Sequence, residues 1–324
     1  MRLLPPFGIP HMAVVSALLP VFLVIALGVL LKQTLLPERS AWDSLERLTF
    51  YVLFPALLTV TTATADLSEV PVAGVGGALF LAIIILSALL LLFRQPISRA
   101  LGINGAAFTS VFQGAVRWNT YVALAIAGSL HGVLGLALAS VAIVAMVPIL
   151  NFICVLVLAR YAADKAPDAR TTAVMVLRNP LIWSVLAGIA INVSGIPLPA
   201  IAISFLEILG RGALALGLLA VGAGLELDKA LRPSAAVVAA VVLKLAVMPA
   251  IAIALAVWFG LSGPALLVVA IASSVPSAPG AYILARQMGG DAPLYAHILT
   301  MQTLIALLTI PAVLAIVNRT AAMP

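Results

Sequence analysis

The chain has very few cysteines and charged residues, and each shortage excludes a class of protein. Its 324 residues include a single cysteine, Cys154, so no disulfide can form within the chain. Only 9% of the residues are charged, whereas soluble domains carry about 25%. Hydrophobic residues make up 64% of the chain, and its mean hydropathy is +1.24. This composition excludes a soluble globular protein and indicates an all-α polytopic membrane protein in a lipid bilayer.

Membrane topology explains the positive charge of the chain better than nucleic-acid binding does. The net charge is +6, and the basic residues lie mostly between apolar segments. Ten lysines and arginines fall in one set of loops and two in the opposite set. This bias places both termini outside the membrane and the central loop in the cytoplasm. No nucleic-acid partner is expected.

Apolar windows long enough to cross a bilayer recur along the whole chain. They predict about ten transmembrane helices, at residues 12–33, 44–64, 70–93, 104–130, 133–160, 172–194, 199–225, 233–261, 264–288 and 293–317. The longest polar segment, residues 161–171, is predicted to be a cytoplasmic linker. It separates a five-helix repeat at 1–160 from a second at 172–324, and both belong to one integral membrane domain.

The two halves share an internal pattern at an offset of 160 or 161 residues. The matching residues are Pro20, Gly28, Pro37 and Glu46 in the first half and Pro180, Gly188, Pro197 and Glu207 in the second. Because each half holds an odd number of spans, the second repeat is expected to be inverted relative to the first. Inverted repeats with a binding site near the midplane are typical of secondary transporters.

Polar or helix-breaking residues interrupt the fourth and the ninth predicted spans. The fourth carries RWNTY at 117–121, and the ninth carries PSAPG at 276–280. Irregular backbone inside a bilayer is tolerated only where it is buried in protein or lines a cavity. In the repeat register the two interruptions are equivalent, so helices 4 and 9 are expected to cross there. Helix N-termini that meet at such a point would favour an anion.

The sequence resembles the auxin efflux carrier family, in WNTYVALAIAGSLHG at 118–132 and in SVPSAPGAYILARQMGGDAPLYAHILTMQTLIALLTIPAVLAI from Ser274 onward. The resemblance covers essentially the whole chain. It implies a ten-helix fold like that of the bile-acid/sodium symporters, with elevator-type alternating access. It also implies transport of small organic anions such as malonate, malate or auxin-like carboxylates, and a homodimer as in the plant members.

Two departures from the plant carriers refine this interpretation. The plant carriers have a proline before the fourth-helix asparagine, where this chain has Trp118. Their long cytoplasmic loop is replaced here by about eleven residues, which favours a bacterial permease in the inner membrane. The resemblance implies that Asn119, which matches the family's crossover asparagine, contacts the substrate carboxylate. Its amide could equally cap the following helix.

The candidate substrate-binding residues belong to the two interruptions and to the second span. They are Arg117, Asn119, Thr120, Tyr121, Pro276, Ser277, Pro279, Gly280 and Thr59. Arg117 could instead pair with a carboxylate such as Glu207. His297 and Glu207 are candidates for proton coupling, although a membrane histidine is more often a satisfied interhelical donor. Coupling to protons, coupling to sodium and uniport all stay open.

Rival functions make different demands on the sequence. A sodium-coupled organic anion symporter of bile-acid type is the alternative, because its sodium sites need only carbonyl, hydroxyl and amide oxygens. A cation/proton antiporter needs a carboxylate near the crossing point, and neither interrupted span has one before Asp291. An intramembrane enzyme would need an acid–base pair, a metal cluster or an activated nucleophile. We therefore predict a transporter that is not an enzyme and has no metal site or cofactor.

Overall fold

The fold is that of a computed structural model, which describes residues 11–64, 71–162, 180–195, 197–225, 227 and 233–321. All regular secondary structure in these residues is helical. Most of the predicted linker at 161–171 lies outside the described residues, as does the start of the sixth predicted span. The all-α prediction is therefore confirmed for the described part of the chain.

The helices before the linker run in chain order as follows. They are α1 (His11–Thr34), α2 (Arg39–Leu48), the π-helical turn η1 (Thr49–Leu53), α3 (Phe54–Thr64), α4 (Val72–Leu92), α5 (Arg94–Leu101), α6 (Gly105–Val116) and α7 (Thr120–Tyr161). Within α7, Gly132 adopts a left-handed φ of 55° that favours glycine, and it divides the helix where the fourth and fifth predicted spans meet.

The helices after the linker follow in the same way. They are α9 (Pro180–Ser194), α10 (Ala200–Ala223), α11 (Ala235–Val242), the π-helical turn η3 (Leu243–Val247), α12 (Met248–Trp258), α13 (Gly263–Ser274), α14 (Gly280–Gln287) and α15 (Ala292–Ala321). Both π-helical turns precede a proline by two residues, at Pro55 and Pro249. A proline has no N–H for the helical ladder, so the wider turn falls where that ladder is already interrupted.

Six stretches of the described chain are long and apolar enough to cross a membrane. They are Arg39–Thr64, Val72–Leu92, Gly105–Tyr161, Ala200–Ala223, Ala235–Trp258 and Ala292–Asn318. Shorter apolar helices occur at Leu18–Thr34, Pro180–Ser194 and Gly263–Ser274. These helices coincide with the predicted windows, while the count of ten spans and the inverted repeat stay predictions.

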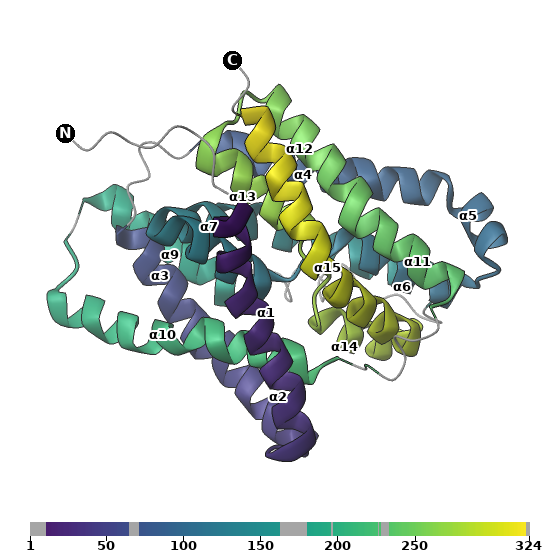
Figure 1. Cartoon of the computed structure of the whole chain (residues 1–324), viewed down its shortest axis with the longest axis horizontal. Helices are drawn as coiled ribbons and strands as arrows, with labels where there is room; N and C mark the ends of the chain where they lie inside the picture. Colours follow the sequence, from purple (N-terminus) through teal and green to yellow (C-terminus); the bar gives the residue numbers. More distant parts are fainter. Residues whose placement is uncertain are drawn as a thin grey trace.

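The helices pack into two groups that are joined by α7 and by the contact of α1 with α15 (Figure 1). The first group consists of α1, α2, η1, α3, α9 and α10, and the second consists of α4, α5, α6, α11, η3, α12, α13, α14 and α15. Figure 1 shows α3 and α10 on one side of the molecule and α4, α5, α11 and α12 on the other. The long helix α7 contacts members of both groups. A site between the groups would therefore change shape if they moved relative to each other.

Glycines let the helices of the first group approach closely. A Cβ added at Gly28 of α1 would overlap the backbone carbonyl of Leu219 in α10, and one added at Gly222 would overlap that of Ile25. Close contact through small residues is a main source of helix association in membranes, where the lipid is as apolar as the side chains. The contact makes α1 and α10 a tightly packed pair.

Candidate functional site

The first interruption separates α6 from α7 at residues 117–119. Arg117 and Asn119 have extended backbone, with ψ angles of 156° and 99°. The Asn119 side chain then caps α7, because its Oδ1 accepts the backbone N–H groups of Tyr121 at 3.1 Å and Val122 at 3.3 Å. The fourth predicted span is thus broken even though Trp118 stands where the plant carriers have a proline.

The second interruption separates α13, which ends at Ser274, from α14, which begins at Gly280. Prolines at 276 and 279 remove two backbone donors from this stretch, so the helix cannot continue through it. Tyr295 of α15 supports the stretch by donating its hydroxyl to the Ala278 carbonyl at 2.7 Å. The interruption predicted from the two prolines is present.

A backbone hydrogen bond joins the two interruptions directly. The N–H of Asn119 donates to the carbonyl of Pro276 at 2.8 Å. Each group would lack an intrahelical partner at a helix break, and such groups are costly to leave unpaired in a membrane. The two breaks therefore satisfy each other.

Gln302 of α15 forms a second link between the interruptions. Its Oε1 accepts the Ser277 N–H at 3.0 Å, and its Nε2 donates to the carbonyls of Gly114 at 2.9 Å and Ala240 at 3.1 Å. The side chain is fully buried, so these contacts satisfy backbone groups that water cannot reach. Gln302 thus ties the end of α6 to the backbone of the second break.

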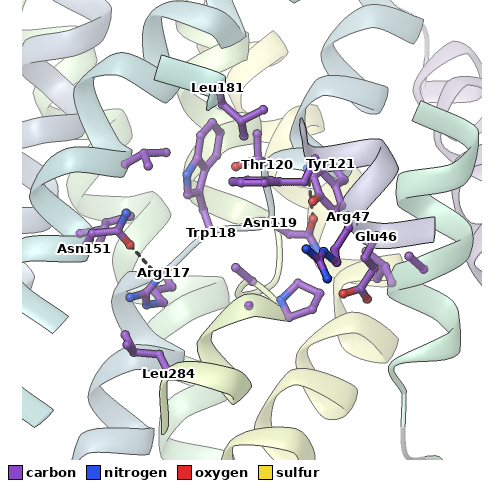
Figure 2. Close-up of a pocket in the computed structure, with 18 of the residues that line it drawn as sticks. Glu46, Arg47, Arg117, Trp118, Asn119, Thr120, Tyr121, Asn151, Leu181 and Leu284 are labelled. Atoms are coloured by element: carbon purple, nitrogen blue, oxygen red, sulfur yellow. Dashed lines mark hydrogen bonds between the residues drawn. The ribbon is translucent and has the colours of Figure 1, made fainter. Parts of the chain in front are cut away.

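A cavity of about 1030 Å³ lies at the interruptions and between the two helix groups. The first group contributes residues of α2, η1, α9 and α10, and the other wall comes from the two breaks, α7 and α14. Figure 2 shows Asn119 near the centre of the pocket, with Arg117 and Asn151 on one side and Glu46 and Arg47 on the other. The cavity is large enough for a small organic molecule.

Two uncharged donors of the first break have no hydrogen-bond partner among the residues that the structure describes. They are the Nδ2 of Asn119 and the Nε1 of Trp118. Both side chains are almost fully buried, at 1% and 3% exposure, and both residues line the cavity. A buried donor without a partner is costly, so it is a candidate contact for a ligand acceptor. The adjacent N-terminus of α7 adds a positive helix end.

Arg117 keeps its positive charge free of carboxylates in the described part of the chain. Its Nη1 donates to Oδ1 of Asn151 at 3.3 Å. Glu207, the alternative partner expected from the sequence, instead lies 4.0 Å from Arg211 on the exposed face of α10. The hypothesis that Arg117 pairs with Glu207 is therefore wrong, and Arg117 lines the cavity with its charge uncompensated.

The helix α2 supplies a set of charged residues to the cavity that the sequence did not predict as a site. These residues are Arg39, Asp43, Glu46 and Arg47. Their spacing places them on one face of a helix, and Trp42, at the flank of that face, packs against α10. The spacing of these charged residues was the sequence signal that could have identified α2 as a wall of the cavity. Arg286 of α14 also lines the cavity.

The predicted candidates divide into residues that line the cavity and residues that do not. Those that line it are Arg117, Asn119, Thr120, Tyr121, Pro279 and Gly280. Those outside its lining are Thr59, Pro276, Ser277, His297 and Glu207. Thr59 donates its hydroxyl to the Ser184 carbonyl of α9 at 3.2 Å, so it links two helices of the first group.

Aromatic contacts join the two walls of the cavity. The ring of Tyr121 stacks on Phe54 of α3, with centroids 4.6 Å apart and an interplanar angle of 7°. The guanidinium of Arg39 on α2 lies 5.7 Å from the ring centroid of Tyr282 on α14. Both contacts connect the first helix group to an interrupted helix, and both would have to change if the groups slid past each other.

Comparison with known proteins supports a transporter. Residues 168–314 match the sequence model of a family described as membrane transport protein. The match includes the second interruption and most of α15 but not the first interruption. The comparison with curated proteins gives no match. Six apolar helices and this match together indicate an integral membrane protein with a small-molecule substrate.

Proposed function

We propose that the chain is a secondary carrier for small organic anions, with its binding centre where the two interruptions meet. The observation that carries this proposal is the buried, unpartnered Nδ2 of Asn119 in a cavity that four arginines also line. An amide can donate to a carboxylate without the fixed charge that would hold the anion too tightly to be released. The candidate substrates are malonate, malate, lactate and auxin-like carboxylates.

Alternating access fits the placement of the cavity between two helix groups. In this proposal the second group and the two breaks move as an elevator against the first group, which the Gly28 and Gly222 contacts keep compact. The direct bond between Asn119 and Pro276 would let both breaks move together with the bound anion. The inverted five-helix repeats and the crossing of helices 4 and 9 are part of the same proposal.

A sodium-coupled symporter of bile-acid type is the second candidate. The amide of Asn119 and the hydroxyl of Thr120 line the cavity, and amide and hydroxyl oxygens can hold a sodium ion. Uptake that requires a sodium gradient would favour this mechanism over proton coupling or uniport. In either case the carrier is proposed to act in a bacterial inner membrane with both termini outside.

A homodimer is proposed to form through α10. Only 22% of its apolar window is buried, against 39–50% for the other five long stretches. The Glu207–Arg211 pair lies well inside this helix with side chains 50% and 77% exposed, which is costly against lipid. In a two-fold dimer each pair would be covered by its copy. Differently tagged Glu207→Arg and Arg211→Glu chains should co-purify with each other but not with themselves; equal co-purification of every pairing would remove α10 from the interface.

Transport by purified protein in lipid vesicles tests the proposed function. Vesicles would be loaded separately with labelled malonate, malate, lactate and indole-3-acetate, with and without gradients of sodium or protons. We expect counterflow of at least one of these anions, because counterflow needs no gradient of a coupling ion. Empty vesicles and vesicles with an Asn119→Ala chain provide the controls. If none of the anions moves through the folded protein, the proposal fails.

A further inference from the structure

Glu46 is a carboxylate in a cavity that otherwise attracts anions. It lies on α2, is half-buried and lines the same cavity as Asn119. Figure 2 shows it beside Arg47, facing the space below Asn119 and Tyr121. An ionised Glu46 would repel a carboxylate substrate held at Asn119, because both would share one poorly solvated space. A residue with this effect is unexpected in a site that only binds anions.

The Glu46 carboxylate has no partner that would fix its charge. Within the described part of the chain, no hydrogen bond reaches it and no cationic nitrogen lies within 4.0 Å of it. Asp43, one turn earlier on the same helix face, adds a second negative charge nearby but is itself exposed. Two carboxylates on adjacent turns disfavour double ionisation. Glu46, the more buried of the two, is therefore the better acceptor for a proton.

The other charged and titratable groups around Glu46 come from every wall of the cavity. They are Arg39, Asp43, Arg47 and Tyr51 beside it in the chain, Arg117 and Tyr121 across the cavity, and Arg286 with Tyr282 on α14. The helices behind α2 present apolar side chains to Trp42 of this helix, including Leu31, Leu219 and Ala220. The arginines stay charged at all relevant pH values, so they cannot respond to a proton gradient. Glu46 can.

We infer that Glu46 is the proton-coupling residue of the carrier. This inference rests on the proposed function. When the anion binds at Asn119, the carboxylate of Glu46 takes up one proton, and both ligands are released when the cavity opens to the other side. No covalent bond to the substrate forms. By linkage, protonation of Glu46 strengthens anion binding, and the bound anion strengthens protonation by the same factor.

The sign of the pH dependence follows directly. Anion affinity is highest where Glu46 is protonated, and it falls as pH rises, by up to about tenfold per pH unit for one linked proton. A change of affinity with pH can be assigned to the protein only if the probe anion does not itself titrate in the same pH range. Lactate and indole-3-acetate stay ionised between about pH 6 and about pH 8 and are suitable probes.

The test compares Glu46→Gln with wild type in binding and in transport. Glutamine has the shape of a protonated glutamate, so the variant should bind the probe at about pH 8 as tightly as wild type does at low pH. Its affinity should no longer depend on pH. An inward proton gradient should no longer accelerate its uptake, while counterflow persists. Glu38→Gln, on the exposed N-cap of α2 and outside the cavity lining, is the matched control that should keep the wild-type dependence.

Each other result overturns the inference in a distinct way. If wild type binds and exchanges the anion with no pH dependence, Glu46 does not couple protons, while the proposed carrier function stands. If Glu46→Gln binds more weakly at every pH, the ionised carboxylate instead positions the arginines of the cavity or holds the fold, and thermal melting of the variant separates these two. If Asp43→Asn removes the pH dependence and Glu46→Gln does not, Asp43 takes up the proton and the assignment to Glu46 is wrong. If wild type binds no anion, the proposed function itself fails.

Discussion

The first interruption presents side chains to the cavity, whereas the second presents mostly backbone. Asn119, Trp118 and Arg117 point amide, indole and guanidinium donors toward the site. Of the second interruption, only Ala278, Pro279 and Gly280 line the cavity, and none of these has a polar side chain. Substrate recognition should therefore depend on side chains at the first break and on main-chain geometry at the second.

The two interruptions also differ in what keeps them non-helical. Prolines at 276 and 279 prevent a helix at the second break whatever surrounds it. The first break has no proline and depends on partners elsewhere in the fold, namely the Pro276 carbonyl for the Asn119 N–H and Asn151 for Arg117. The second break is thus encoded locally, and the first is encoded by tertiary contacts.

The largest effect is expected from Asn119, whose side chain has two separable tasks. Asn119→Ser keeps an oxygen that can cap α7 but removes the amide donor, and Asn119→Ala removes both. Loss of a hydrogen bond to a carboxylate costs about 1.5–3 kcal/mol, so both variants should lose about tenfold to a hundredfold in anion affinity. Binding titration and vesicle counterflow would measure this loss.

The difference between the two Asn119 variants measures the cap. Only Asn119→Ala should also lose about 1 kcal/mol of stability, because serine is a good capping residue. Thermal melting in detergent provides the comparison. Wild-type affinity in Asn119→Ser would show that the asparagine acts only as a cap and would remove it from the binding centre.

Gln302 should affect stability more than specificity, since it contacts the breaks but does not line the cavity. Gln302→Leu leaves the Ser277 N–H and the Gly114 carbonyl without this partner, whereas the Ala240 carbonyl still accepts the N–H of Leu243. Each orphaned buried group costs about 1–3 kcal/mol, so the unfolding free energy should fall by about 2 kcal/mol or more. Thr303→Val is the control, because its hydroxyl only bonds back to its own helix. Equal melting temperatures for the two variants would contradict this role.

The smallest effect is expected from Pro276. Pro276→Ala keeps the carbonyl that accepts the Asn119 N–H. The Ser277 N–H can also still donate to Oε1 of Gln302. The break should persist, with a stability change of about 1 kcal/mol or less and uptake within about threefold of wild type. Uptake kinetics and melting would be measured in parallel with the Asn119 variants. A loss as large as that of Asn119→Ala would show that the second break contributes more than backbone.

Much of the fold could be predicted because its signals are local. Apolar runs indicate where the helices lie, and the prolines at 276 and 279 suffice to locate the second interruption. The polar run at 117–121 indicates the first interruption, but Trp118 gives no local reason for the chain to leave the helix. That reason is the hydrogen bond to Pro276, about 160 residues away, which no local pattern reveals.

The cavity was only half predicted, for a related reason. The residues of both breaks were expected there, but α2 was not, because its charges sit at the start of an apolar span and resemble a membrane edge. Glu46 and Glu207 show most clearly what the sequence repeat cannot predict, since they occupy matching positions in it. Glu46 faces the cavity, while Glu207 pairs with Arg211 on the exposed face of α10. Equivalent positions in a repeat need not have equivalent neighbours.

The hydrogen bond between Asn119 and Pro276 has a consequence for how the carrier can vary. Both atoms belong to the main chain, so apart from a proline at position 119 no exchange of a side chain removes either one. Residues 117–121 can therefore be altered to change what the cavity accepts without uncoupling the two breaks. A chain built in this way is a suitable starting point for engineered carriers, in which selectivity is redesigned at one break while the other is left untouched.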